Sequence, residues 1–195
     1  MRILNLSLLG LCVALAACQG KQAQQAVSAT PVLILSKTLI ASESIQWLTL
    51  PFLSSAERLQ IADKGLQMIG GDGQVLNELP GRFETLDHRA DAHGVLVASL
   101  DRKRQQALLT RFNSAQQWSA PRYLPKTRFA IEGLCLYRDS ARNDFLFLVG
   151  EEGIGEQWLV AEQGRPLTSP SLVRALSLPP ESGFCQVDDR SDSLY

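Results

Sequence analysis

The chain has 195 residues, a formal net charge of −1 at pH 7 and an apolar fraction of 45%. This length and apolar content suit one globular domain, or part of a larger one, with a buried core. Nucleic acid is not an expected partner, because its binding needs a basic groove and the largest Lys/Arg cluster here is the triplet Arg102-Lys103-Arg104.

The N-terminal residues have the pattern of a lipoprotein signal peptide. Met1-Arg2 supplies a positive charge, an apolar run extends from Ile3, and Leu15-Ala16-Ala17-Cys18 ends it. The run is too short for a permanent membrane-spanning helix, and small residues before the cysteine suit a signal peptidase pocket. We expect a signal peptide over residues 1–17 and lipid attachment at Cys18. An ordinary secretory signal that happens to hold a cysteine is the alternative.

The residues after Cys18 predict where the protein is anchored. Gln19 stands where an aspartate would favour retention at the inner membrane, so we expect an outer membrane lipoprotein that faces the periplasm or the cell surface. Residues 18–30 are rich in Gln, Ala and Ser without an apolar period, which is typical of a flexible tether. The folded domain is expected over residues 31–195.

Short apolar runs from residue 32 onward predict β-strands. Gly70-Gly71-Asp72-Gly73 predicts a hairpin turn, because its glycines can adopt positive φ and strand-like runs flank it. A helix from Arg102 to Phe112 is an alternative to the strand expected at Gln106–Phe112. Gly164-Arg165-Pro166 predicts a turn. The other expected strands are 32–35, 47–50, 58–62, 65–69, 74–76, 83–89, 94–99 and 173–178.

The segment from Ile131 to Trp158 contains three further predicted strands: Gly133–Tyr137, Phe145–Val149 and Glu156–Val160. Its opening recurs fifty positions later, since Gly133, Cys135 and Asp139 are echoed by Gly183, Cys185 and Asp189. A period of this length indicates radial repetition of small antiparallel sheets, as in a β-propeller.

Two cysteines remain after the signal peptide and the lipidated cysteine are set aside. Cys135 and Cys185 occupy equivalent places in two repeats, and export would make a disulfide between them chemically possible. Two small buried apolar residues are an equally acceptable interpretation.

Several phrases along residues 56–195 resemble the β-propeller phytases in order and spacing. They are Gly-Leu-Cys-Leu-Tyr at Gly133–Tyr137, Glu156-Gln157-Trp158, and Gly183 with Asp188-Asp189 and Leu194-Tyr195; the segments 65–76 and 82–89 fit the same register. The resemblance implies a six-bladed propeller that binds calcium ions in an acidic cleft and hydrolyses phytate. Calcium held by carboxylates would neutralise the phosphates of such a substrate and orient water.

The resemblance also implies site residues, although some phrases of the family are missing. In the family's Asn-Asn-Val-Asp-Ile-Arg phrase only Asp87 and Arg89 are retained here, and the early Asp-Asp-Pro-Ala-Ile-Trp phrase has no counterpart before Ile61. Arg89 is the expected phosphate-binding residue, with a surface arginine at a strand end as the alternative. Asp87 and Glu132 are the expected calcium ligands. No catalytic residue is assigned.

Two functions follow from these observations. The first is a calcium-dependent phytase domain that is incomplete, with about three antiparallel blades and little or no activity on phytate or another phosphorylated small molecule. The second is a noncatalytic, lipid-anchored interaction module, a degenerate propeller portion whose partners would be further blades or a second phytase domain. The missing ligand phrases favour the second function for this chain taken alone.

The lipoprotein prediction is tested at Cys18. Cys18→Ser removes the thiol that takes the lipid, so the protein should move from the membrane fraction to the soluble fraction. Fractionation and labelling with a radioactive fatty acid would measure this. A wild-type protein that never incorporates the label would rule out the anchor.

Overall fold

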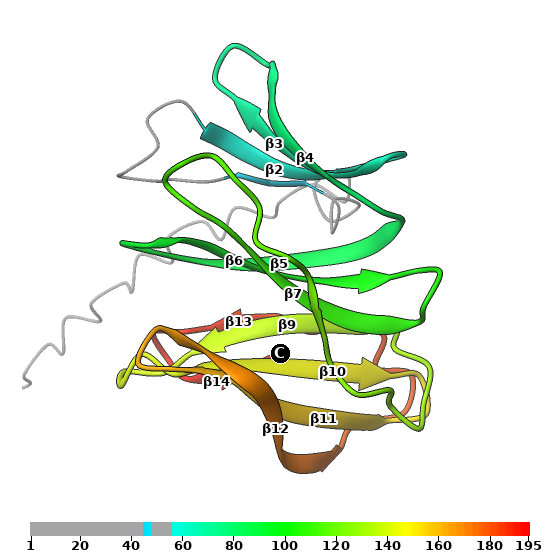
Figure 1. Cartoon of the computed structure of the whole chain (residues 1–195). Helices are drawn as coiled ribbons and strands as arrows, with labels where there is room; N and C mark the ends of the chain where they lie inside the picture. The colour runs from blue at the N-terminus through cyan, green and yellow to red at the C-terminus, as the bar shows by residue number, and fades with distance from the viewer. Residues whose placement is uncertain (1–44, 48–55) are drawn as a thin grey trace, which may run out of the picture. The chain divides into compact units, whose positions relative to one another are not determined.

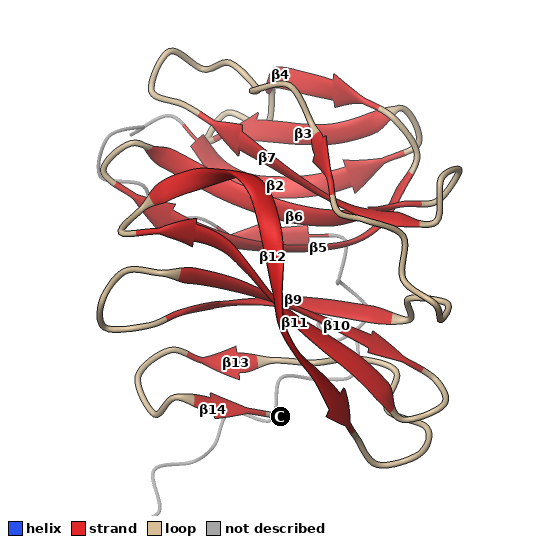
Figure 2. Cartoon of the chain, turned by 60° about the horizontal axis from the view of Figure 1, so that its bottom comes forward, coloured by secondary structure: helices blue, strands red, loops and turns tan. Residues whose placement is uncertain are grey.

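The computed structural model describes residues 45–47 and 56–195, and all of them belong to one compact unit, residues 35–195. They form strands joined by turns, without any helix in these ranges (Figure 2). The all-β prediction is therefore confirmed for this part of the chain. Among the same residues, no helix has the length and apolar character that crossing a bilayer requires. The predicted signal peptide, Cys18, the tether and the predicted strand at 32–35 lie outside the described residues.

The strands form three four-stranded antiparallel sheets and one two-stranded sheet (Figure 1). The first sheet contains β1 (Ile45–Trp47), β2 (Ala56–Ala62), β3 (Gly65–Gly70) and β4 (Val75–Pro80). The second contains β5 (Phe83–Asp91), β6 (Gly94–Asp101), β7 (Gln106–Phe112) and β8 (Arg122–Tyr123). The third contains β9 (Gly133–Arg138), β10 (Asp144–Gly150), β11 (Ile154–Glu162) and β12 (Arg165–Ser177). The last is the hairpin of β13 (Val187–Asp188) and β14 (Ser193–Leu194).

Strand β6 shows how the sheets pack face to face. All of its residues are buried, and successive side chains point to opposite faces of the second sheet. Val95 and Val97 join a core shared with the first sheet, whereas Leu96, Ala98 and Leu100 join a core shared with the third. A continuous apolar run in the sequence therefore encodes a strand with a sheet on each side.

Two glycines are required by the backbone at the predicted turns. Gly73 has φ +80° and donates its N–H to the carbonyl of Gly70 at 2.9 Å, which closes the hairpin between β3 and β4 as predicted. Gly94 has φ +142°, and a Cβ there would lie 2.2 Å from the carbonyl oxygen of Phe112. Any other residue at Gly94 would push against the backbone at the end of β7.

Two local predictions are decided by the structure. Residues 106–112 form strand β7, so the alternative helix is wrong; tertiary pairing with β6 overrides the helix-compatible composition. The predicted turn at Gly164-Arg165-Pro166 is wrong beyond Gly164, because β12 already begins at Arg165. β12 is the outer strand of its sheet, and an outer strand tolerates proline where the missing N–H would have faced away from its partner.

The fifty-residue repeat places equivalent residues side by side. β9 lies beside both β5 and β13. Cys135 in β9 forms a disulfide with Cys185, which precedes β13, across a Cα–Cα distance of 5.7 Å. This decides the choice that the sequence left open. Gly133 lies against Gly183 and Phe184, where a Cβ would come within 2.7 Å of the Phe184 Cα.

Reducing the disulfide should loosen the β13–β14 hairpin selectively. The hairpin has few buried side chains, and closing a loop of 50 residues is worth about 4 kcal/mol in the chain-entropy account. We expect the amides of Gln186 and Tyr195, which bond each other's carbonyls, to lose exchange protection on reduction. Protection of Leu148 in β10 should be unchanged. Hydrogen exchange with and without reductant measures both, and equal loss at all three sites would contradict a local effect.

Candidate functional site

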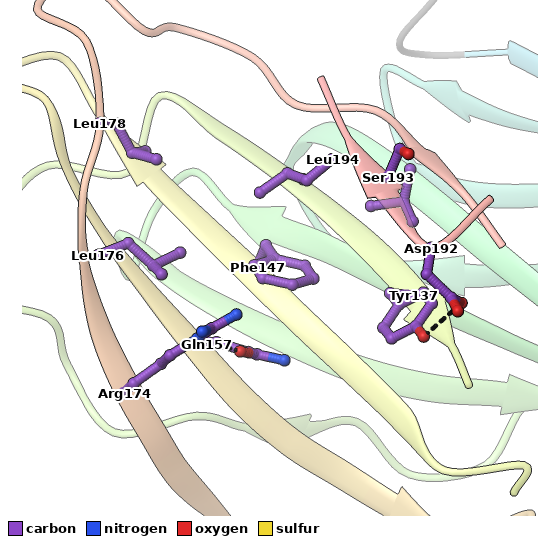
Figure 3. A pocket seen from close by; sticks show the side chains of 10 residues that line it. Tyr137, Phe147, Gln157, Arg174, Leu176, Leu178, Asp192, Ser193 and Leu194 are labelled. Carbon is purple, nitrogen blue, oxygen red and sulfur yellow. Dashed lines mark hydrogen bonds between the residues drawn. The ribbon is translucent and has the colours of Figure 1, made fainter. Parts of the chain in front are cut away.

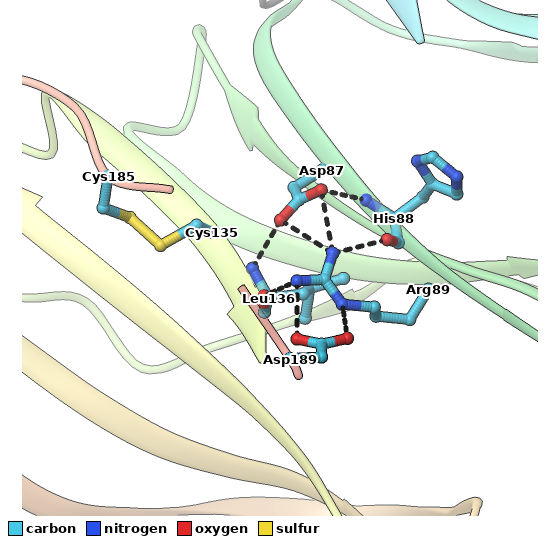
Figure 4. Close-up of a disulfide and its surroundings, with 7 residues drawn as sticks. All are labelled: Asp87, His88, Arg89, Cys135, Leu136, Cys185 and Asp189. Carbon is cyan, nitrogen blue, oxygen red and sulfur yellow. Dashed lines mark hydrogen bonds and ion pairs between the residues drawn. A yellow bond between two sulfur atoms is a disulfide. The ribbon is translucent and has the colours of Figure 1, made fainter. Parts of the chain in front are cut away.

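The predicted site residues Asp87 and Arg89 lie on β5 and face the free edge of β9 (Figure 4). An Oδ atom of Asp87 accepts the backbone N–H of Leu136 at 2.7 Å, and Nη2 of Arg89 donates to the Leu136 carbonyl oxygen. Leu136 belongs to β9, the first strand of its sheet, so these two groups have no strand to pair with on that side. Side chains of β5 therefore satisfy backbone groups that would otherwise be buried without partners.

Arg89 is fully engaged by neighbouring groups. Its Nε and Nη2 donate to the two carboxylate oxygens of Asp189 at 2.7 and 3.0 Å. Its Nη1 donates to Asp87 at 3.2 Å and to the carbonyl oxygen of His88 at 2.8 Å. With the bond to Leu136, these contacts use all five N–H groups of the guanidinium. The bidentate pair with Asp189 ties the second sheet to the segment between β13 and β14.

A second group of ion pairs continues the cluster along the same sheet interface. Arg138 pairs with Asp144 through bonds of 2.6 and 3.0 Å, and it also lies 3.6 Å from Asp91. Asp91 is shared with Arg111, whose Nη1 lies 2.9 Å from each carboxylate oxygen. The side chains of Asp144 and Asp91 are 0% and 4% exposed, so both need these arginine partners.

The cluster shifts the pKa of two groups in ways that follow from its geometry. Burial alone would raise the pKa of Asp91, but the N–H of His93 and the charges of Arg111 and Arg138 more than offset it, so the pKa lies below 3.8. Burial lowers the pKa of His88, an effect that Arg89 strengthens and Asp87 opposes. Burial and Arg89 therefore favour the neutral imidazole of His88.

The expected calcium ligands do not form a metal site with each other. Both carboxylate oxygens of Asp87 already accept backbone N–H groups, from His88 and Leu136. Glu132 is exposed, and its backbone N–H donates to the carbonyl of Val149. Within residues 45–47 and 56–195, no group of three His, Cys, Asp or Glu side chains is gathered around a common point. Calcium needs about six to eight oxygen ligands, so the residues present do not fit it.

Sequence reasoning found two members of the cluster and missed the other five. Asp189, Arg138, Asp144, Asp91 and Arg111 were not among the predicted site residues. Asp189 carried a signal, because it repeats Asp139 at the interval that also relates the two cysteines. Nothing in the sequence pairs Asp189 with Arg89, which lies 100 positions earlier.

A pocket of about 290 Å³ lies between the third sheet and the β13–β14 hairpin (Figure 3). At one end the hydroxyl of Tyr137 donates to Asp192 at 2.7 Å, a bond that raises the Tyr137 pKa to about 12. At the other end Nε of Arg174 donates to the side-chain oxygen of Gln157 at 2.7 Å. Apolar side chains line the space between: Phe147, Leu176, Leu178, Val187 and Leu194.

Comparison of the chain with protein-family models and with curated proteins gave no match.

Asp91→Asn should reveal the contribution of the ion-pair cluster to stability. At pH 7 the free energy of unfolding should fall by about 3–5 kcal/mol, because Arg111 and Arg138 lose a shared buried carboxylate. The folded-state pKa of Asp91 is lowered, so its stabilising effect is present above the ordinary pKa of 3.8 and is lost as pH falls through the folded-state value.

The difference between wild type and Asp91→Asn should therefore begin to shrink below about pH 4, where the Asp91 carboxyl protonates in the unfolded chain, and should be lost as pH falls through the lower folded-state pKa. Urea unfolding at several pH values measures it. Asp63→Asn, at an exposed aspartate in the β2–β3 turn, is the matched control and should be close to neutral. A difference that stays constant down to pH 2 would contradict the assignment.

Proposed function

We propose that the described sheets are successive blades of a six-bladed propeller of the phytase-like kind, and that this chain acts as a noncatalytic interaction module. Three features support the propeller. Each of the first three sheets runs through four strands in chain order, the sheets pack face to face, and the strands β5, β9 and β13 that open the last three sheets are neighbours. Radial repetition of four-stranded sheets is the propeller arrangement.

The noncatalytic role rests on one observation, the complete engagement of Arg89. A guanidinium that binds a substrate phosphate must offer N–H groups to it. Here two carboxylates and two backbone carbonyls take all five. Asp87 and Arg89 thus hold neighbouring sheets together. This structural role does not require phytase activity.

The proposed module is held at the outer membrane by the lipid on Cys18, and its function is to bind other proteins. Its partners would be other β-sheet segments of the same architecture, such as further blades or a phytase domain. A calcium-dependent phytase remains the competing function, and the two differ in what the purified protein does to phytate.

Phytate turnover tests the proposal directly. Residues 19–195 should release no inorganic phosphate from phytate above the buffer rate, with calcium or with a chelator present. A phosphate-release assay over hours measures this. Robust turnover that a chelator abolishes would overturn the noncatalytic role.

A pair of variants separates a structural arginine from a substrate-binding one. Arg89→Ala and Asp189→Asn should each lower the unfolding midpoint, and the double variant should be less destabilised than the sum, because the two side chains are partners. If Arg89 instead serves phytate, Asp189→Asn would free its guanidinium. Calorimetric titration would then show tighter phytate binding in Asp189→Asn than in wild type.

A further inference from the structure

Arg111 has an N–H edge that the described residues leave unused. Its Nη1 lies 2.9 Å from each carboxylate oxygen of Asp91, and its side chain is 14% exposed. Within the described part of the chain, its Nε and Nη2 are buried and have no hydrogen-bond partner. A buried donor without a partner is costly and rare in native proteins, so this edge requires an explanation.

A second arginine lies beside this edge. Arg122 on β8 stands directly opposite Leu109 on β7, two positions from Arg111. Residues two apart on a strand share one face of the sheet, and so do residues opposite each other on paired strands. Leu109 lies in the core between the second and third sheets, so both arginines face that interface. Arg122 also donates from Nη1 to the carbonyl oxygen of Leu167 on β12.

The positive charges of the two arginines repel each other. Burial lowers the pKa of Arg122, and the charge of Arg111 lowers it further. Asp91 meets Arg111 from the Nη1 side only and is shared with Arg138. Arg122 forms no ion pair with any carboxylate of residues 45–47 and 56–195. The charge of Arg122 therefore has no direct partner at this interface.

We propose that a small planar oxyanion with one negative charge, such as a short-chain carboxylate, binds between Arg111 and Arg122. Its two oxygens accept the Nε–H and Nη2–H of Arg111, the parallel donors that match a carboxylate. One of these oxygens also meets the guanidinium of Arg122, whose Nε and Nη2 have no bond to a described residue. Because the Arg111 edge is buried and Arg122 is half-buried, the anion enters past Arg122.

Water alone does not meet both requirements of this place. A water molecule can accept N–H groups of Arg111, but it carries no charge to offset that of Arg122. A single negative charge suffices, because Asp91 already meets Arg111 from its other side. The inference goes beyond the interaction function proposed above and does not depend on it, since it concerns a ligand held between the second and third sheets.

The bound anion stabilises a short strand of the second sheet. β8 has two residues and pairs with β7 at Leu108 and Leu109. The next residue, Leu124, donates its N–H to the carbonyl of Ala107 at 2.9 Å. An anion that holds Arg122 against Arg111 also holds β8 against β7. The amide of Leu124 should therefore exchange its hydrogen more slowly when the anion is bound.

Formate is the smallest carboxylate probe for this site. In nitrogen-15-labelled residues 19–195, the Nε–H signal of Arg111 should shift saturably as formate is added in the millimolar range, with ionic strength held by a bulky sulfonate buffer. The signal is assigned through bonds from the Arg111 backbone. Chloride should bind more weakly, because a single spherical centre cannot place a separate acceptor on each parallel donor. Chloride binding as tight as that of formate would overturn the planar oxyanion.

Three variants test the two arginines. Arg122→Gln removes the second charge but keeps a side-chain N–H group, and it should weaken formate binding about tenfold. Arg111→Lys keeps a positive charge for Asp91 but lacks the parallel donors, so formate should no longer raise the unfolding midpoint as it does in wild type. Arg128→Gln, at an exposed arginine without an ion pair among the described residues, is the matched control and should bind formate as wild type does.

The inference is overturned if the Arg111 signal shows no saturable shift up to about 100 mM formate, because the site then holds only water. Equal formate binding by wild type and Arg122→Gln also overturns it. So does an equal loss in Arg122→Gln and Arg128→Gln, which would indicate a general effect of charge. If Arg111→Lys does not fold, the wild-type titration and Arg122→Gln still decide the question.

Discussion

The structure depends on how the free edge of β9 is satisfied. β9 opens its sheet, so one side of its backbone has no strand partner, yet neighbouring segments bury it. Asp87 accepts its N–H at Leu136, Arg89 donates to the carbonyl of the same residue, and Asp189 accepts the N–H of Arg138 at 3.2 Å. An unpaired buried backbone group costs roughly 1–3 kcal/mol, so charged side chains from the two flanking segments replace a missing strand. The disulfide beside Leu136 fixes one of these segments in place.

The strands could be predicted because their local signals agree with the tertiary structure. Alternation and short apolar runs identified β5, β6, β9 and β10, and the glycines at 70–73 identified the turn before β4. The extent of β12 could not be predicted. Pro166 and Pro170 argue against a strand in general, and they are tolerated only because β12 has a partner on one side. The position of β12 at the edge depends on the order of strands in the sheet, which a local sequence pattern does not reveal.

Two residues of the cluster, Asp87 and Arg89, could be predicted from the sequence, but their structural role could not. Asp87 and Arg89 were singled out by a resemblance, and the structure brings both to one place. A sequence cannot distinguish an arginine that awaits a phosphate from one held by a carboxylate 100 positions later, because both need the same residue type at the end of the same strand. Glu132 was expected to bind calcium together with Asp87, but its side chain is exposed, and the described residues contain no group of three side chains that could hold a metal ion. The repeat of Asp139 at Asp189 was the one signal that could have pointed to the missing partner.

The edges of the sheets explain why an interaction role and an enzymatic one make different demands on the same architecture. The chain treats its edges in two ways: prolines occupy or flank the outer strands, and charged side chains cap β9. Capping β9 uses Asp87, Arg89 and Asp189, and a phosphate-hydrolysing site would need groups of the same acidic and basic types. A carboxylate that accepts two backbone N–H groups has little left for a cation, and an arginine with five bonds has none left for a substrate. The same side chains therefore cannot both hold the sheet interface together and bind a cation or a substrate. Here the hydrogen bonds of Asp87 and Arg89 serve the interface.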